Sequence, residues 1–562
     1  MARYTAPMAK SRSRRCCCCC CAALALLLLL LGVAVAAWLS VAALREARCA
    51  DGGFGAAAVA ADSPTCSEIG RDVLKEGGSA VDAAIAALLC TSLVNPQSMG
   101  IGGGSIFTIM DKNGKVKIIS SRETAPKAFK ADLLKECSAR LMTGTQWIGV
   151  PGELRGYQEA HRLYGKLPWS RLFEPSIRLA REGIPLPPYL AKFLQMPILK
   201  EQLEKSTLCE LFCKVNNTLK YPRLAATLDT IAQQGAEAFY TGTIARDLTE
   251  DIQAAGGSIT LEDLASFKVR EAEALTVPLG DYTMFIPPPP AGGVILSFIL
   301  NIMKGFSLTP ASIQGDQEVL TMHRYIEACK FANGQKKKIK DTQFNSGDVS
   351  YLMQEGFIKR IRAMITSDTT HEAGYYNVTP SLDRFGTTHV SVLAEDGSAV
   401  SVTSTINQIF GSMVYSPRTG IILNNELADF CGTSESIRTG EQPPSSMTPS
   451  ILRSESKGRT IIIGGSGGSL ITTAVAMSIM NHVWFGMNLD EAISAPVLFV
   501  DGTNKVNFEK QFNKTVKDTL MTFGHEAGNW PYFLNVVNAV SKKNSCIQAT
   551  SDSRKLGRAA GY

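Results

Sequence analysis

The sequence predicts an α+β protein that is attached to a membrane by an N-terminal helix. Three observations support this: residues 16–44 carry no charge, helical patterns dominate residues 61–336, and a hairpin pattern follows at residues 389–405. The chain of 562 residues is 45% hydrophobic, which is enough for a large core. Its 19% charged and 7% aromatic residues exclude a disordered or collagen-like chain.

The net charge of the chain is concentrated at its N-terminus. There are 57 Lys and Arg residues against 51 Asp and Glu, but residues 1–49 hold seven of the bases and one of the acids. Residues 50–562 therefore carry 50 of each and are neutral. This balance disfavours a general nucleic-acid-binding surface, and we expect no nucleic-acid partner.

Residues 16–44 predict a transmembrane signal anchor. These 29 uncharged positions exceed the roughly 20 that a helix needs to cross a bilayer. Because five basic residues precede the segment, the positive-inside rule places residues 1–15 in the cytosol. A stalk (45–60) and the body then lie outside the cell. The chain would cross the plasma membrane once, in type II orientation. A cleaved signal peptide is the alternative, although its apolar core usually spans only about 7–15 residues. For Cys16–Cys21, palmitoylation and a tolerated apolar run are both open.

Nine cysteines lie beyond that segment, and an extracellular location permits disulfides. Two predicted antiparallel helices are joined by the short turn Gly77–Gly78, which brings Cys66 near Cys90. Cys209 and Cys213 lie one helical turn apart and form a second candidate pair. The sequence assigns no partner to Cys49, Cys137, Cys329, Cys431 and Cys546. None of the six histidines has a metal-ligand spacing, so we expect no metal and no cofactor.

Several segments between the helices and the hairpin carry further signals. The glycine-rich turn at 100–104 lacks the features of a phosphate loop or a dinucleotide fingerprint, so we expect close backbone packing there. Pro287–Pro290 predict a rigid break before an apolar helix at Ile295–Met303, and the polar residues 337–385 predict an exposed connector. Three sequons agree with a secreted topology: Asn216, Asn377 and Asn513.

Asp396 and Gly397 lie at the middle of the alternating segment and predict a two-residue β-turn. Strand pairing from that turn would place Thr387 opposite Ile406 and diagonal to Thr405. Two hydroxyl groups would then gather at one end of the hairpin. Threonine is an ordinary strand residue, so the pattern alone is a weak signal for catalysis.

A second candidate site is the glycine-rich turn that contains Gly467 and Gly468, between an apolar strand and an apolar helix. Amides at a strand-to-helix turn point together and favour developing negative charge, as an oxyanion hole does. The same turn also fits the Gly-x-Ser-x-Gly nucleophile motif, with Ser466 attacking and His482 or His525 as its base. A serine hydrolase is therefore an alternative interpretation.

A set of motifs, taken in order, resembles the gamma-glutamyltransferase family. These motifs are Ser121–Glu123, Gly386–Val392, Thr403–Asn407, Asn424–Glu426, Ser445–Met447, Gly464–Gly468 and Ser551–Lys555. The resemblance extends from about Val59 to Tyr562. Within the family, Asn95–Met99, Pro287–Gly293 and Met413–Leu427 look most like the leukotriene C4-hydrolysing isoform.

The resemblance implies an N-terminal-nucleophile hydrolase, a four-layer αββα sandwich that matures by self-cleavage. The zymogen would be cut between Gly386 and Thr387 into a large subunit (61–386) and a small catalytic subunit (387–562), which stay together as a heterodimer. A threonine hydroxyl needs an adjacent base. The α-amine freed by cleavage, with an ordinary pKa of about 7.7–8.0, suits that task. Gly386 gives the backbone freedom at the scissile bond.

A γ-glutamyl group presents a carboxylate and an ammonium, so its site needs cationic and anionic groups together. The resemblance implies that Thr387 is the nucleophile, Thr405 bonds its hydroxyl, Gly467 and Gly468 form the oxyanion hole, Arg122 binds the carboxylate, Glu426 and Asp429 bind the ammonium, and Asn407, Ser445 and Ser446 also hold the substrate. Without the resemblance, Arg122 and the two acids would be interpreted as solvated surface residues.

The implied activity is γ-glutamyl transfer from glutathione, or from a glutathione S-conjugate such as leukotriene C4, through a γ-glutamyl-threonine intermediate. The acceptor would be water or the amine of an amino acid or dipeptide, which gives ping-pong kinetics. Besides the Ser466 hydrolase, a non-catalytic family member is an alternative. Every expected catalytic residue type is present, which disfavours that alternative.

Overall fold

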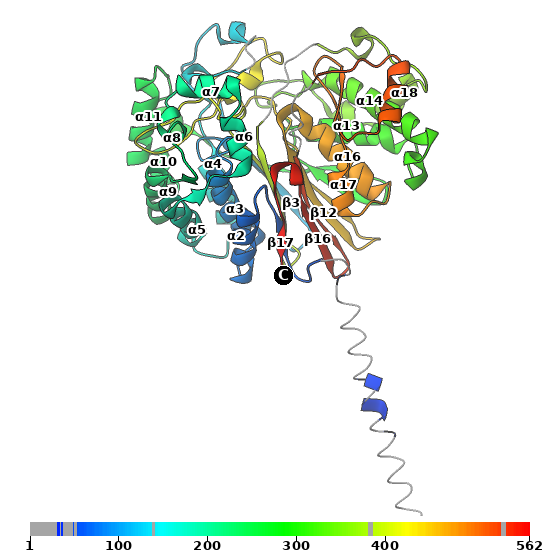
Figure 1. Ribbon diagram of the computed structural model, residues 1–562, viewed down its shortest axis with the longest axis horizontal. Coiled ribbons are helices and arrows are strands. Elements are labelled where there is room, and N and C mark those ends of the chain that lie inside the picture. Colours follow the sequence, from blue (N-terminus) through cyan, green and yellow to red (C-terminus); the bar gives the residue numbers. More distant parts are fainter. Residues whose placement is uncertain are drawn as a thin grey trace, which may run out of the picture.

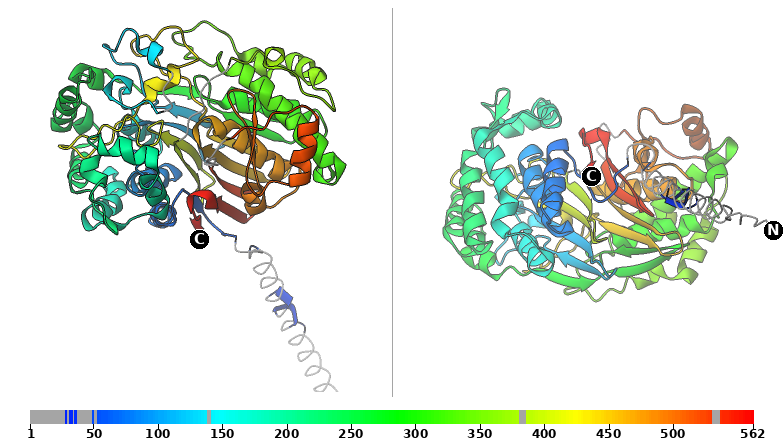
Figure 2. Two further views of the ribbon diagram at one scale, coloured as in Figure 1. Left: turned by 45° about the horizontal axis from the view of Figure 1, so that its top comes forward. Right: turned by 90° about the horizontal axis from the view of Figure 1, so that it is seen from below.

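The computed structural model describes residues 28, 31–33, 35–36, 49, 53–137, 141–379, 386–529 and 536–562. Two antiparallel sheets face each other, and helices cover both outer faces (Figure 1). Figure 2 shows the same arrangement from two other directions. The layers stack in the order αββα.

Sheet I has seven strands in the order β17-β1-β9-β10-β2-β3-β6, and all neighbouring strands are antiparallel. Its strands are β1 (Ala58–Ala60), β2 (Gly104–Met110), β3 (Val116–Ser120), β6 (Arg270–Glu273), β9 (Thr388–Leu393), β10 (Ala399–Thr405) and β17 (Ala560–Gly561). The predicted hairpin forms the β9–β10 pair, with strands from the N-terminal half of the chain on both sides.

Sheet II has six strands in the order β16-β15-β12-β11-β8-β7, again antiparallel throughout. They are β7 (Leu275–Leu279), β8 (Tyr282–Ile286), β11 (Ser450–Ser454), β12 (Arg459–Ser466), β15 (Val536–Lys543) and β16 (Cys546–Ser551). Two small sheets pair β4 (Ile184–Pro185) with β5 (Thr218–Leu219), and β13 (Leu498–Val500) with β14 (Val506–Phe508). Apolar side chains such as Leu393 and Ile462 fill the space between the two large sheets, where burial stabilises the sandwich.

The helical layer on sheet I comes from the N-terminal half of the chain. It contains α2 (Pro64–Lys75), α3 (Ala80–Val94), α4 (Glu153–Tyr164), α5 (Trp169–Glu182), α6 (Pro188–Leu194), α7 (Pro197–Glu204), α8 (Cys209–Phe212), α9 (Pro222–Gln234), α10 (Glu237–Tyr240), α11 (Thr243–Ala254) and α12 (Leu261–Ser266). Helix α3 packs on β9 and β10, and it begins at a capping box between Ser79 and Asp82. The predicted helix pair 66–76 and 80 onward is therefore confirmed.

The layer on sheet II contains α13 (Gly293–Lys304), α14 (Asp316–Lys336), α15 (Glu355–Met364), α16 (Ile471–Val483), α17 (Leu489–Ser494) and α18 (Lys514–Thr522). Helix α16 packs on β12 and β15, and α13 covers α16. The apolar helix predicted at Ile295–Met303 lies within α13. The exposed connector predicted for 337–385 is wrong in part, because it contains α15 and buries Leu352, Ile358 and Tyr376.

The predicted hairpin register is wrong by one residue. The loop has three residues, Glu395 to Gly397, because Ala394 pairs with Ser398 and Gly397 adopts a φ of 84°. Residues paired across β9 and β10 therefore include His389 with Thr403. The same register places Thr387 opposite Thr405 rather than opposite Ile406.

The glycine-rich turn before β2 packs closely, as predicted. A Cβ at Gly102, Gly103 or Gly104 would collide with backbone oxygens of neighbouring segments. The carbonyl of Thr405 is one of these neighbours, so the turn sits against the end of β10. The turn therefore packs against the end of the hairpin and holds it in place.

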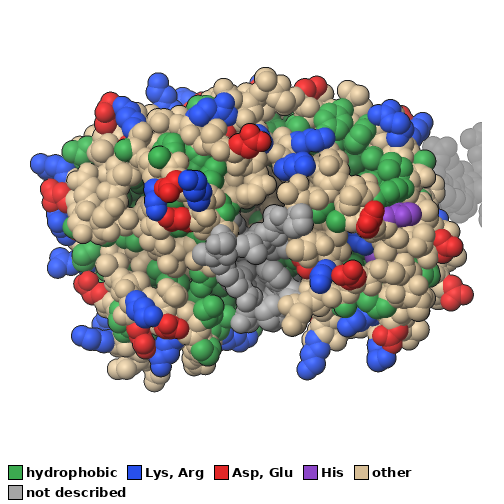
Figure 3. Space-filling model, turned by 90° about the horizontal axis from the view of Figure 1, so that it is seen from above, with side chains coloured by type: hydrophobic (Ala, Val, Ile, Leu, Met, Phe, Trp, Pro, Cys, Tyr) green, Lys and Arg blue, Asp and Glu red, His purple; other side chains and the backbone are tan. Residues whose placement is uncertain are grey.

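The predicted tail (1–15), the anchor (16–44) and the palmitoylation candidates Cys16–Cys21 lie outside the described residues, apart from a few isolated positions in the anchor. Within the described part of the chain, no helix has both the length and the apolar character to span a bilayer. Acidic and basic side chains are interspersed on the face of the body shown in Figure 3, around a central hollow. Asn216, Asn377 and Asn513 are all exposed.

Candidate active site

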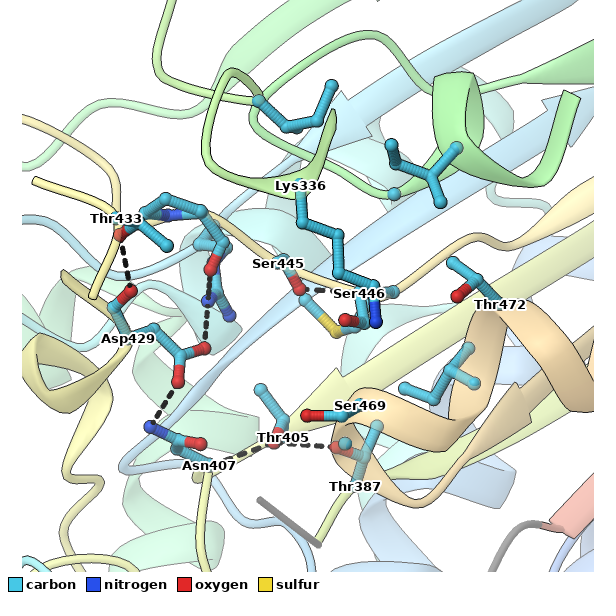
Figure 4. Close-up of a pocket in the computed structure, with 18 of the residues that line it drawn as sticks. Lys336, Thr387, Thr405, Asn407, Asp429, Thr433, Ser445, Ser446, Ser469 and Thr472 are labelled. Atoms are coloured by element: carbon cyan, nitrogen blue, oxygen red, sulfur yellow. Dashed lines mark hydrogen bonds and ion pairs between the residues drawn. The ribbon is translucent and has the colours of Figure 1, made fainter. Parts of the chain in front are cut away.

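One pocket lies at the open end of the β9–β10 hairpin (Figure 4). Among the residues that line it are Arg122, Thr387, Thr405, Asn407, Glu426, Asp429, Ser445, Ser446 and Gly468. The fold thus brings together residues that are spread over more than half of the sequence. Lys336, Cys431, Ser469 and Thr472 also line the pocket and were not predicted.

Thr387 directly precedes β9 and is buried. Its hydroxyl lies 3.0 Å from the hydroxyl of Thr405. Its φ of 84° is strained for a β-branched residue. Gly386 has no room for a side chain, because a Cβ there would collide with the carbonyl oxygen of Asn407. Backbone strain and close packing therefore coincide at the Gly386–Thr387 bond.

The carbonyl of Gly386 is already hydrogen-bonded at the predicted oxyanion hole. The amide of Gly467 donates to it over 2.9 Å. Gly467 and Gly468 have φ values of 117° and 59°, which glycine adopts without strain, and they connect β12 to α16. An amide in this position stabilises negative charge that develops on the carbonyl oxygen.

A buried lysine that was not predicted as a site residue holds the other side of Thr387. The Lys555 ammonium donates to the carbonyl of Thr387 (2.6 Å), to Asp62 (2.8 Å) and to Ser466 (2.9 Å). Asp62 also accepts from Thr388 and Asn538. Lys555 belongs to a motif that carries the family resemblance, and nothing else in the sequence indicated a role for it. Nothing in the sequence indicated a role for Asp62.

Arg122 is fully buried and forms a charged clamp with Glu426 and Asp429. Its guanidinium lies 2.5 Å from Glu426 and 2.7 Å from Asp429. It also donates to the carbonyls of Pro443 and Pro444 at 2.9 and 2.6 Å. The interpretation of these residues as solvated surface is therefore wrong. Glu426 and Asp429 were predicted to bind the substrate ammonium, and Arg122 the substrate carboxylate. In this structure Arg122 is paired with both acids.

Two buried glutamates at this clamp, Glu426 and its neighbour Glu123, have raised pKa values because they are buried. Burial raises the pKa of Glu426 to about 8; Arg122 lowers it and the neighbouring Asp429 raises it further. Burial and Glu426 together raise the pKa of the adjacent Glu123 well above its usual range. Arg122 thus faces more acidic groups than one positive charge can neutralise.

Asn407 connects the clamp to the hairpin. Its side-chain amide donates to Asp429 and to the carbonyl of Asn425, each over 3.1 Å, and its backbone amide donates to the Thr405 hydroxyl over 2.8 Å. Ser445 is held by a hydrogen bond from its amide to Pro290. Figure 4 shows a continuous line of hydrogen bonds from Thr387 through Thr405 and Asn407 to Asp429.

The sequence of the body matches a known family. A family model described as Gamma-glutamyltranspeptidase matches residues 66–562. The chain belongs to the gamma-glutamyltranspeptidase family. It is 48% identical to the glutathione hydrolase 5 proenzyme of Mus musculus, over 94% of this chain and 97% of that protein. The Homo sapiens protein of that name is 47% identical, over 92% and 94%.

Solved structures agree with this assignment. Cephalosporin acylase from Bacillus halodurans superposes with a TM-score of 0.81 at 25% identity, covering 92% of this chain and 97% of that one. Gamma-glutamyltranspeptidase of Helicobacter pylori gives a TM-score of 0.53 at 30% identity, over 58% and 95%. The predicted α+β N-terminal-nucleophile hydrolase fold is confirmed, and the chain is an enzyme of this family.

In this member of the gamma-glutamyltranspeptidase family, neither of the histidines proposed as the base of a serine hydrolase is hydrogen-bonded to Ser466. Ser466 is buried and accepts a hydrogen bond from Lys555. The ring nitrogens of His482 bond to the Met487 carbonyl and the Ser541 hydroxyl. The ring nitrogens of His525 bond to Lys330 and His323.

The fold groups His323, Glu327 and His525, which sequence spacing did not reveal. Lys330 donates to Nδ1 of His525, whose Nε2 donates to Nδ1 of His323, both over 2.9 Å. Nε2 of His323 donates to the carbonyl of Thr366 over 3.0 Å. All four ring nitrogens therefore bond to protein groups, and a lysine amine lies beside them.

The structure contains four disulfides among the described residues. Cys66 is bonded to Cys90 and Cys209 to Cys213, the two pairs that lie close in sequence. The other two, which the sequence did not assign, are Cys49–Cys546 and Cys137–Cys431. Cys329 is a buried free thiol, and burial raises its pKa to about 12, so it is kept protonated.

Proposed function

We propose that the protein is a cell-surface γ-glutamyl hydrolase and transferase that acts on glutathione and on glutathione S-conjugates such as leukotriene C4. The observation that carries the proposal is the strained Thr387, whose hydroxyl lies 3.0 Å from that of Thr405 beside a carbonyl bonded to Gly467. The 48% identity to a glutathione hydrolase 5 proenzyme supports the substrate class.

Self-cleavage comes first. The Thr387 hydroxyl adds to the carbonyl carbon of Gly386, its proton passes to the Thr387 nitrogen, and the peptide C–N bond breaks to leave an ester. Water hydrolyses this ester, giving Gly386 a carboxylate and Thr387 a free α-amine. The Gly467 amide stabilises the oxyanion, and one such donor is worth roughly 3 kcal/mol. The products are the large subunit, ending at residue 386, and the small subunit, 387–562.

Turnover uses the same groups. The free α-amine of Thr387 takes the proton of its own hydroxyl, which attacks the γ-carbonyl of the substrate. Gly467 and Gly468 hold the oxyanion, and Thr405 orients the nucleophile. The amine leaving group takes the proton and departs, and water or an acceptor amine then attacks the γ-glutamyl-threonine ester. No metal or other cofactor enters this scheme.

Substrate recognition falls on the γ-glutamyl head. Arg122, Ser445 and Ser446 bind its α-carboxylate, and Glu426, Asp429 and Asn407 bind its α-ammonium. When substrate binds, its carboxylate pairs with Arg122 and its ammonium pairs with the two acids, in place of the ion pairs that Arg122 forms with those acids in the empty site. Because these contacts involve only the head, leaving groups as different as cysteinylglycine and a lipid conjugate are accepted.

Residues 16–44 are proposed to anchor the enzyme in the plasma membrane with residues 1–15 in the cytosol. A chain beginning at residue 45 behind a cleavable signal should be secreted into the medium in active form. The full chain should stay in the membrane pellet after alkaline extraction. Release of the full chain by alkali would contradict the anchor.

Thr387→Ala and Thr387→Ser together test the proposed function. The alanine variant should remain one chain without activity, because it lacks the attacking oxygen. The serine variant keeps the oxygen and should still cleave, more slowly. N-terminal sequencing of the wild-type small subunit should read Thr-Thr-His-Val, and the enzyme should turn over glutathione, leukotriene C4 and a γ-glutamyl anilide. A cleaved alanine variant would refute the nucleophile, and an uncleaved, inactive wild type would favour the non-catalytic alternative.

A further inference from the structure

The small subunit is attached to the large one by more than packing. Residues 387–562 contain only two cysteines, Cys431 and Cys546. Cys431 is bonded to Cys137 and Cys546 to Cys49, and both partners precede the proposed cleavage point. Every cysteine of the small subunit therefore crosses to the large one, and scission of the backbone leaves two covalent links.

The two links differ in their relation to the pocket. Cys431 lines the pocket and follows the short turn Glu426–Phe430, which carries both acids of the clamp. The Cys431 amide donates to Ala428 over 3.1 Å, and the Thr433 hydroxyl donates to the carbonyl of Asp429 over 3.0 Å. Cys546 instead begins β16, at the edge of sheet II.

The turn that carries the acids rests on residues of the other subunit. Trp147 and Leu133 of the large subunit pack in one apolar cluster with Leu427 and Phe430 of the small subunit. Cys137 and Cys431 border this cluster. After cleavage, the distance of 2.7 Å between Arg122 and Asp429 is a contact between two chains.

We infer that the Cys137–Cys431 disulfide is a covalent brace between the two subunits that positions the ammonium-binding side of the pocket. The inference rests on the proposed cleavage before Thr387. The brace holds the Asp429 turn against Arg122 and so acts on substrate binding through Asp429. Cys49–Cys546 links the same two subunits away from the pocket and provides a matched control.

Denaturing gels test the covalent link. The mature enzyme should run as one band without reductant and as two bands with it. Each paired variant, C137S/C431S or C49S/C546S, should still run as one unreduced band, and the variant with all four serines should give two. Two bands for the unreduced wild type would overturn the brace alone. One band in both lanes would overturn self-cleavage, and the brace with it.

Kinetics test the positioning role. In C137S/C431S the KM for a γ-glutamyl anilide should rise about fivefold while kcat stays within about twofold, because substrate binding is weakened and the chemical step is not. C49S/C546S should keep the wild-type KM. An unchanged KM in folded C137S/C431S would overturn the role in positioning.

Partial reduction of folded C49S/C546S keeps the test valid even if C137S/C431S does not fold. Dithiothreitol supplies two electrons and two protons, leaves as its cyclic disulfide, and converts the remaining bridge between the subunits to two thiols. The KM should rise in proportion to the fraction of subunits that separate on an unreduced gel. A KM that stays constant while the subunits become separable would overturn the inference.

Discussion

The nucleophile hairpin and the charged clamp meet in one pocket, but they are built in different ways. Thr387 and Thr405 are 18 residues apart and face each other because two adjacent strands pair. Arg122 is 307 residues from Asp429 and reaches it only when separate elements of the fold pack together. The hairpin therefore depends on local backbone pairing, and the clamp depends on the whole tertiary structure.

The two regions also differ in charge. The hairpin contributes neutral hydroxyls, whose burial costs little once they are hydrogen-bonded. The clamp buries ionisable groups, each of which is destabilising without its partners. We therefore expect substitutions in the hairpin to affect chemistry more than stability, and substitutions in the clamp to affect stability and binding together.

Arg122→Ala should have the largest effect. It removes the positive charge that Glu426 and Asp429 share, together with the carboxylate-binding group, so we expect a loss of about 3–5 kcal/mol in the free energy of unfolding. The kcat/KM should fall at least about a hundredfold through KM. Thermal unfolding and steady-state kinetics with a γ-glutamyl anilide measure both.

Arg122→Lys is the control for that prediction. It keeps the positive charge but not the planar fork that spans both acids, so it should recover stability more than binding. If Arg122→Ala lost binding and kept full stability, the clamp would not be the structural unit described here.

Thr405→Val should have an intermediate effect and a different signature. It removes the hydroxyl next to Thr387 and leaves the Asn407 amide without its acceptor, which costs about 1–3 kcal/mol. Self-cleavage and kcat should slow about tenfold or more, with KM nearly unchanged. Band intensities over time and kcat measure this.

Thr405→Ser keeps both hydrogen bonds and should mature at close to the wild-type rate. A loss in the serine variant with none in the valine variant would show that the methyl group, not the hydroxyl, is what matters at this position. The hairpin would then contribute packing alone.

The same contrast explains what could be predicted from the sequence. Asp396 and Gly397 indicated the hairpin, because turn chemistry is local, but two- and three-residue loops share that signal, and the register was wrong by one. The helix pair joined by Cys66–Cys90 was predictable for the same reason, since its ends are 24 residues apart.

Contacts between distant residues gave no such signal. Cys137 and Cys431 are 294 residues apart, and no periodicity relates them. The pairing of Lys555, in the short turn before β17, with Asp62, between β1 and α2, spans 493 residues and forms only after folding. For Arg122, Glu426 and Asp429 the family resemblance supplied the roles, and only the structure shows that Arg122 is ion-paired with both acids.

The smallest effect we predict is a dependence on pH that separates binding from stability. Because the folded-state pKa of Glu426 is raised to about 8, above the unfolded value near 4.5, its contribution to stability is full at low pH and is lost as pH rises through about 8. A substrate ammonium is bound more tightly by the ionised carboxylate than by the protonated one, so KM should fall about fivefold from pH 6 to pH 8 while the unfolding temperature also falls. In Glu426→Gln, KM should be high at every pH, and stability should decline less steeply than in the wild type, by at most about 1.4 kcal/mol per pH unit. Parallel pH profiles in the two proteins would show that Glu426 is ionised in the empty site, with Arg122 outweighing the effect of burial.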